Sequence, residues 1–262
     1  MNTPVGTDPY TVSATGLAIP TTDNFYVIGN AGKVVRLTPT GTTWSGAVDA
    51  DWANAANWSN GVPDNTLEAI IPASLSIYPL ISTTQNIKNL TVASGAAITN
   101  NGTLNIYGPT VSSNGTLGGN GVYTFAGAVV QTITGSFSVN NLTLNNNSGI
   151  VNNGVLTVNS ALPVMAGSIT GTAPVYSTDL PVTFIGSGTS ASGLILNPSS
   201  GNVGILNING SGTLNMTAAG TTKNLLLTAG TLNNSSYNIT ISESATRIAG
   251  ALASAPAYSG SI

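Results

Sequence analysis

Short stretches that alternate apolar and polar residues recur through most of this chain and are separated by turn-forming dipeptides. Examples are residues 142–144 (LTL) and 155–158 (VLTV). Alternation with a period of two is typical of half-buried β-strands, and Asn-Gly pairs such as 101–102 and 153–154 favour tight turns. Because Gly, Asn, Thr and Ser are poor helix formers, the sequence predicts an all-β fold of short strands.

The strand-like stretches also repeat. Leu90, Leu142 and Leu194 lie in similar local sequences at intervals of 52 residues. Residues 101–106 (NGTLNI) match residues 153–158 (NGVLTV) at the same offset. A short strand cannot bury its apolar face alone, whereas stacked copies bury one continuous core. If a coil takes roughly 20–29 residues, the repeat spans about two coils, and we expect the three leucines to lie over one another.

The repeats therefore predict a right-handed parallel β-helix, or β-solenoid, with a tryptophan-rich cap at its N-terminal end. Serial β-sandwich domains are the alternative, since they also contain short strands, although they would not keep a fixed register. We expect residues 1–41 to form a β or linker segment, residues 42–80 the capping module, and residues 81–262 about seven or eight coils of a fragment of a longer chain.

Charged side chains are scarce. They make up 5% of the 262 residues, against about 25% in an average globular domain, and residues 89–178 contain none. Equivalent positions on successive coils lie ~4.8 Å apart, where two like charges repel by roughly 0.9 kcal/mol even in water. Asparagine can instead form amide ladders along a stack, so this composition favours a solenoid.

The composition also excludes several kinds of function. Five Lys and Arg residues leave no basic patch for nucleic acid. Because Cys and His are absent, neither thiolate or imidazole metal sites nor Ser-His-Asp and Cys-His catalysis is possible. No stretch approaches the ~18 apolar residues of a membrane-spanning helix. We expect no enzyme activity, catalytic residues, metal, cofactor or membrane insertion.

A lyase-like β-helix is a further hypothesis, because polysaccharide lyases of this architecture use clustered charged groups and Ca²⁺ ligands. Asp179, Lys223 and Glu243 are distant in sequence, so only stacking of coils could bring them together. Otherwise we expect each to be a solvated charge in a turn, and Glu243 to form a local ion pair with Arg247. A threonine array for ice binding is not favoured, because the pattern at residues 132–134 does not recur at a fixed offset.

All three tryptophans, Trp44, Trp52 and Trp58, lie within residues 42–64. Half of the acidic residues are nearby, namely Asp49, Asp51, Asp64 and Glu68. Terminal repeats of a solenoid must cover its apolar end, so one interpretation is a cap. The other is a carbohydrate-binding module in which the indole rings stack on sugars. The acidic residues lack the spacing of known calcium loops.

The tryptophan segment resembles a module of large secreted and surface-exposed proteins of the Bacteroidetes, many of them exported by the type IX system. That module has the form Trp-x-Gly, Asp-Trp, Ala-x-Asn-Trp and Gly-x-Pro. The matching positions are Trp44/Gly46, Asp51/Trp52, Ala55 or Ala56 with Asn57/Trp58, and Gly61/Pro63. Residues 77–108 and 122–146 are similar to the strand-and-turn stretches that follow it, so the resemblance covers about residues 42–262.

The resemblance implies an extracellular or cell-surface repeat segment of an adhesin-like polypeptide. The function we expect is a non-catalytic structural region, an adhesin-like stalk or fibre-forming scaffold. The expected partners are further copies of the chain, the rest of a larger parent polypeptide, or surface glycans.

Overall fold

The computed structural model describes residues 25–28, 34–37 and 39–258, and the chain divides into two compact units, Met1–Thr38 and Pro39–Ile262. In the first unit, β1 (Phe25–Ile28) pairs antiparallel with β2 (Val34–Leu37). The other residues of that unit, where we expected a β or linker segment, lie outside the described part of the chain. We call the second unit the coiled unit.

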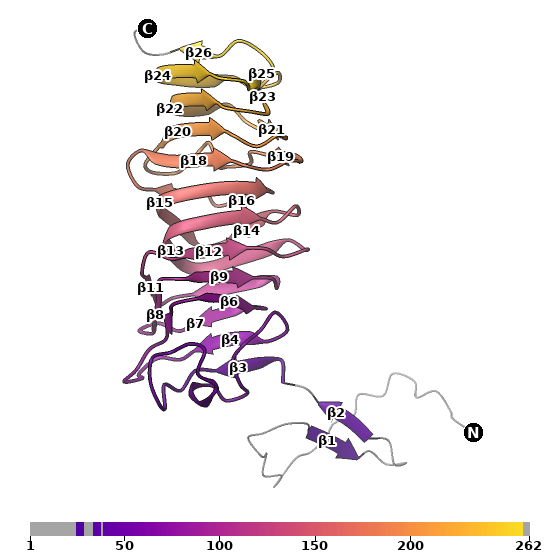
Figure 1. The fold of residues 1–262 in the computed structure, drawn as a ribbon, viewed down its shortest axis with the longest axis vertical. Coiled ribbons are helices and arrows are strands. Elements are labelled where there is room, and N and C mark those ends of the chain that lie inside the picture. Colours follow the sequence, from indigo (N-terminus) through magenta and orange to yellow (C-terminus); the bar gives the residue numbers. More distant parts are fainter. Residues whose placement is uncertain (1–24, 29–33, 38, 259–262) are drawn as a thin grey trace, which may run out of the picture. The chain divides into compact units, whose positions relative to one another are not determined.

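The coiled unit is a β-solenoid of about ten coils, and its strands pair in parallel with those of the next coil (Figure 1). Each coil passes over three faces. The first face comprises β3 (Gly41–Thr43), β4 (Glu68–Ile71), β7 (Leu90–Val92), β10 (Thr110–Ser113), the start of β13 (Gln131–Asn145), β14 (Ile150–Asn152) and β16 (Ile169–Gly171). The second comprises β5 (Leu80–Ile81), β8 (Ala97–Asn100), β11 (Thr116–Gly118), the middle of β13, the start of β15 (Val155–Ala166) and β17 (Val175–Tyr176).

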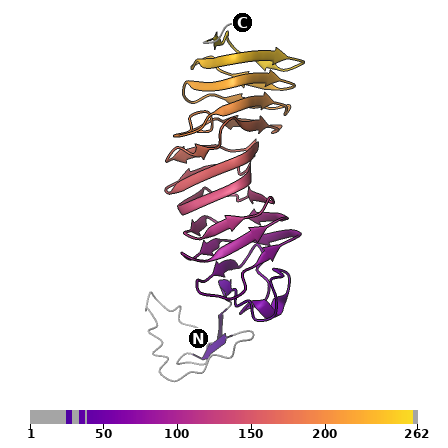
Figure 2. The same ribbon diagram turned by 90° about the vertical axis from the view of Figure 1, so that its left-hand side faces the viewer.

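The third face is the longest. It comprises β6 (Thr84–Ile87), β9 (Thr103–Ile106), β12 (Val122–Phe125), the ends of β13 and β15, β18 (Leu180–Phe184), β20 (Val203–Ile208), and the ends of β22 (Gly220–Leu227) and β24 (Ile239–Arg247). The C-terminal coils add a sheet of β19 (Thr189–Ala191), β21 (Thr213–Asn215), β23 (Thr231–Asn233) and β25 (Ala251–Leu252), while β26 (Ala257–Tyr258) pairs with β24. Figure 2 shows the same coils from the side, one above another.

A single column of inward side chains runs the length of the third face. Its members are Ile87, Ile106, Phe125, Leu144, Val164, Phe184, Ile208, Leu227 and Arg247. All except the final arginine are buried, and full burial of such a side chain stabilises the fold by about 1.5–3 kcal/mol. The parallel register thus joins the coils into one hydrophobic core, which confirms the solenoid and excludes separate sandwiches.

Stacked asparagines form hydrogen bonds between coils. The Nδ2 group of Asn105 donates to Oδ1 of Asn86 at 3.0 Å, and Asn233 makes the same bond to Asn215 at 2.9 Å. Both pairs occupy equivalent positions in neighbouring strands. Amide groups therefore satisfy one another where like charges would repel, as the composition predicts.

Buried amides also support the corners between faces, and the sequence pattern did not reveal them. Gln131 is fully buried, and its Nε2 group donates to the carbonyls of Ile106 and Gly108 at 3.0 and 2.8 Å. Its Oε1 atom accepts from the Gly127 N–H and from Asn146 Nδ2, both at 3.0 Å. One side chain thus satisfies polar groups from several turns, which would be costly to bury unpaired.

Glycine is needed where one corner lies directly over another. A Cβ atom at Gly154 would lie 2.2 Å from the carbonyl oxygen of Gly135 in the coil below, and Gly135 itself has a φ of 74°. Backbone atoms cannot yield to such a contact, and L-residues rarely adopt this φ. The Asn-Gly turns therefore allow the corners to stack at strand spacing.

The expectation that Leu90, Leu142 and Leu194 stack over one another is wrong. Leu90 lies on the first face between Ala69 and Val111, whereas Leu142 lies on the third face beside Tyr123. Leu194 is only partly buried against the same core, and its N–H donates to the carbonyl of Ile169, on the first face.

The physical reason is the length of a coil. The stacked partners Asn86 and Asn105 are 19 residues apart, whereas Asp179 and the asparagine stacked on it, Asn202, are 23 residues apart. The offset between the leucines is therefore not a whole number of coils, and it carries a strand-and-turn unit from one face to another. Most steps are 19 or 20 residues, at the short end of the expected range, so residues 81–262 contribute nine strands to the third face, against seven or eight coils expected.

Candidate functional site

The three tryptophans form one buried cluster. Trp58 packs edge-to-face against Trp44 and Trp52, with ring centroids 5.1 and 4.7 Å apart and interplanar angles of 78° and 70°. The exposed fractions of Trp44, Trp52 and Trp58 are 1%, 0% and 5%. The indole N–H of Trp58 donates to the carbonyl of Trp52 at 2.8 Å, and that of Trp44 donates to the carbonyl of Ile77 at 2.9 Å.

The tryptophan segment lies at the end of the stack, in the indigo loops beside β3 in Figure 1. It connects β3 to β4, contains the short 3₁₀ helix η1 (Ala55–Asn57), and pairs with β5 through a parallel bridge between Asp51 and Leu80. The segment thus forms the first coil and fills its interior with large rings, which confirms the expected cap. No indole face is open to a sugar in this geometry. Binding of glycans to these rings would require the cap to open, and it stays a prediction.

Asp49 holds the loops of the cap together. Its Oδ1 atom accepts from the N–H of Asp51 at 2.9 Å and from Asn57 Nδ2 at 2.8 Å, and its Oδ2 atom accepts from Asn54 Nδ2 at 3.0 Å. These hydrogen bonds, chiefly those from Asn54 and Asn57, hold the pKa of the Asp49 carboxyl below its usual range. The carboxylate is therefore committed to structure.

The other acidic residues of this region serve separate local roles. Asp64 accepts hydrogen bonds from the backbone and hydroxyl of Thr66 at 2.8 and 2.7 Å, while Glu68 accepts from the Thr91 hydroxyl at 2.5 Å. Within residues 39–258 and the two short described strands before them, no three carboxylates gather in a way that suits a metal ion.

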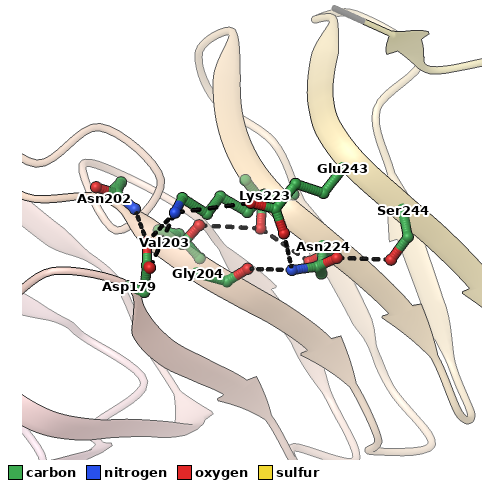
Figure 3. Close-up of polar contacts among 9 residues, drawn as sticks. Asp179, Asn202, Val203, Gly204, Lys223, Asn224, Glu243 and Ser244 are labelled. Carbon is green, nitrogen blue, oxygen red and sulfur yellow. Dashed lines mark hydrogen bonds and ion pairs between the residues drawn. The ribbon is translucent and has the colours of Figure 1, made fainter. Parts of the chain in front are cut away.

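A second cluster assembles on the surface of the C-terminal coils (Figure 3). The Nζ atom of Lys223, at the bend of β22, lies 2.8 and 2.9 Å from the two carboxylate oxygens of Asp179, which precedes β18. Glu243 of β24 lies 3.6 Å from the same Nζ. Stacking thus unites the three charges that the lyase hypothesis named, although Asp179 and Lys223 are 44 residues apart in sequence.

Amide side chains extend this cluster. Asn202 Nδ2 donates to Asp179, and Asn224 Nδ2 donates to Glu243 Oε2 at 3.0 Å. Asn224 also accepts from the Ser244 hydroxyl at 2.6 Å, so the network spans the coils of β18, β20, β22 and β24 (Figure 3). The expected ion pair of Glu243 with Arg247 is wrong, because Glu243 turns to Lys223 while Arg247 Nε donates to the Gly250 carbonyl at 2.7 Å.

The pairing of Lys223 with Asp179 sets the charge state of the cluster. The hydrogen bond to Asp179 raises the pKa of Lys223, and the same bond lowers the pKa of Asp179. Lys223 is therefore protonated at neutral pH and cannot abstract a proton. The side chains of Lys223, Asp179 and Glu243 remain 36%, 43% and 53% exposed, so solvent screens the pair.

Two shallow hollows border the third face. One of about 250 Å³ lies beside Lys223 and is lined mainly by hydroxyl and amide side chains of β20, β22 and β24. The other, of about 370 Å³, lies at the opposite edge, where the strands end, and is lined by Asn145, Asn147, Met165, Ala166, Ile185 and residues 186–190. Neither hollow contains a charged group other than Lys223.

No protein-family model, curated protein or solved structure matches this chain. Across the described part of the chain, no helix is both long and apolar enough to cross a membrane.

Proposed function

We propose that the coiled unit is a non-catalytic structural region that acts as a rigid stalk or spacer of a secreted or cell-surface protein. The observation that carries the proposal is the inward column from Ile87 to Leu227, whose members stay in register from β6 to β22. A solenoid with a continuous core has no hinge, so its two ends are held at a fixed separation.

The polar groups support the same conclusion. Asp49 is hydrogen-bonded within the cap, and Asp179, Lys223 and Glu243 are bonded to one another or to asparagines. Asp49 joins the loops of the cap and the other three groups link coils together, and none of the four is left as an activated nucleophile or base in a closed cavity. Location outside the cell is supported by the resemblance of residues 42–262 to secreted Bacteroidetes proteins.

The spacer role is tested by measuring distances along the rod. Because the chain has no cysteine, spin labels on Thr84→Cys and Ser244→Cys report one distance. These outer positions are eight coil steps apart, or ~38 Å at ~4.8 Å per step. The matched pair Thr84→Cys and Ile205→Cys spans six steps, ~29 Å. With the labelled chain diluted into excess unlabelled chain, so that distances between copies do not contribute, we expect two narrow distributions whose centres differ by ~10 Å, the rise of two steps. Broad distributions would contradict the proposal.

The proposed location is tested on intact cells of the source organism, where a protease added outside should degrade the chain. Retention of the intact chain until the cells are lysed would contradict it.

Glycan binding by the cap is the alternative function. It requires Trp44, Trp52 and Trp58 to expose their rings. Because the structure buries these rings, the stalk proposal predicts that the tryptophan emission of the full chain is that of buried indoles. It also predicts that this emission does not change on titration with polysaccharides. A saturable red shift would favour the carbohydrate-binding module.

The lyase alternative is favoured by one observation, the assembly of Asp179, Lys223 and Glu243 on the surface of a parallel solenoid. It requires polysaccharide cleavage that is lost on replacement of these residues by alanine. Cleavage that survives all three replacements would remove the basis for this alternative.

A further inference from the structure

The outer surface of the third face changes character along the stack. Strand alternation points every second side chain away from the core, and these positions are mainly polar from β6 to β13 and mainly apolar from β15 to β22. The polar set is Thr84, Asn86, Thr103, Asn105, Thr124, Asn141 and Thr143, with Val122 and the exposed Tyr107 among them. The apolar set is Ala161, Pro163, Met165, Pro181, Ile185, Ile205 and Leu226, with Thr183, Asn207 and Asn224 among them, and the last strand, β24, is polar again at Ser244 and Thr246.

The apolar set is accessible to a partner. Met165, Ile185 and Ile205 are 42%, 40% and 44% exposed. The first face differs, because its outward positions are mostly hydroxyl side chains, such as Thr110 and Thr132. The third face therefore differs from the first in combining a parallel sheet with an apolar stretch of outer surface.

The size of the face indicates what could cover it. The four apolar strands, each ~15 Å long and ~4.8 Å from the next, make a patch of ~300 Å², which is ordinary on a monomer. The nine strands of the whole face make ~650 Å², and two such faces in contact amount to ~1,300 Å², within the roughly 1,200–2,000 Å² of specific interfaces. A stable partner must therefore match both halves of the face.

We propose that the third face pairs with the third face of a second copy, and that the two rods point in the same direction, coil against coil. The proposal rests on the structural role argued above and names its partner. A two-fold axis parallel to the stack sets apolar coils against apolar coils and Thr and Asn against Thr and Asn. The opposite orientation would press amides against Met165 and Ile185, leaving desolvated groups unpaired at about 1–3 kcal/mol each.

Charge does not oppose this pairing. Residues 89–178 carry no charged side chain, and Asp179, Lys223 and Glu243 lie at the edge where the strands of the third face begin. The two-fold axis sets this edge against the edge where the partner's strands end, beside the hollow of about 370 Å³. That hollow is lined partly by hydroxyls and amides, so the geometry places polar groups at the rim and apolar groups nearer the centre, as in known interfaces.

Sedimentation of the full chain tests the association. Ile205→Lys and Ile185→Lys should each raise the dissociation constant of the dimer at least tenfold relative to the wild type, because a buried lysine at the interface lacks a partner. The matched control is Val155→Lys, which changes an apolar residue of similar exposure (52%) on the second face. Circular dichroism and melting establish that each variant folds. A wild-type monomer at all concentrations, or equal weakening by Val155→Lys, would overturn the proposal.

Single cysteines test the direction. Thr124→Cys and Asn207→Cys occupy the same outer column four coil steps apart, ~19 Å. With a short bismaleimide, each variant should crosslink to itself, and a mixture should give no crosslink between the two. Thr132→Cys on the first face is the control that should not crosslink. Crosslinks only between the different variants would overturn the parallel orientation. If the chain is a monomer and the spin labels at residues 84 and 244 still give a narrow distance distribution, the pairing is refuted and the spacer role is not. If that distribution is broad, the spacer role is refuted.

Discussion

Replacing Trp58 by alanine should unfold the N-terminal end of the rod while leaving the far end intact. Removal of a buried tryptophan costs about 3–5 kcal/mol. Part of this loss comes from the edge-to-face contacts with Trp44 and Trp52, which contribute about 0.5–1.5 kcal/mol each. The cap is the only cover of the first coil within the coiled unit as described, so the loss falls on that coil.

Hydrogen exchange measured by mass spectrometry resolves where the loss falls. Because a solenoid coil contacts mainly its neighbours, peptides that contain β3 to β6 should open roughly 100- to 4,000-fold more often, the equivalent of about 3–5 kcal/mol. Peptides that contain β20 to β24 should exchange as in the wild type.

The matched control is Phe137→Ala in the middle of the stack. Phe137 is fully buried and makes two edge-to-face contacts, with Tyr123 at 5.5 Å and Phe125 at 5.7 Å. Its loss should raise exchange in the central coils instead. Uniform destabilisation of the whole chain by Trp58→Ala, or no change at β3 to β6, would refute the capping argument.

Three further outcomes are expected. Gln131→Leu should lower the free energy of unfolding by several kcal/mol in urea titrations, although leucine is more apolar, because the Ile106 and Gly108 carbonyls and the Gly127 N–H lose their partner at about 1–3 kcal/mol each; an unchanged urea midpoint would contradict this. Gly154→Ala should destabilise the chain by ~1–3 kcal/mol through its contact with Gly135. The control, Gly188→Ala, has open space around the added Cβ and should leave the melting temperature unchanged. Equal effects of the two substitutions would be inconsistent with corner stacking. Asp49→Asn should lower the melting temperature relative to the wild type above pH 3.8, the usual pKa of that carboxyl. Because the pKa of Asp49 is lowered in the folded state, the difference in melting temperature between the two proteins should disappear as the pH falls through that lowered value. A difference that persists in acid would show that the carboxylate charge is not its source.

The local features of this fold could be predicted from the sequence. Alternation and Asn-Gly turns specify strands and corners because both depend on residues close in the chain. The scarcity of charge reflects a property common to any stack, the short distance between equivalent positions. The cap was also predictable, since Trp44, Trp52 and Trp58 gather in one segment and a solenoid end must be covered.

The register of the coils was decided only by the tertiary structure. Which strands lie over one another depends on the length of every corner, so the step from Asn86 to Asn105 is shorter than the step from Asp179 to Asn202. The repeat of the leucines therefore recorded similar strand-and-turn units on different faces. For the same reason, the contact of Lys223 with Asp179 and the apolar half of the third face became visible only once each coil was placed on the next.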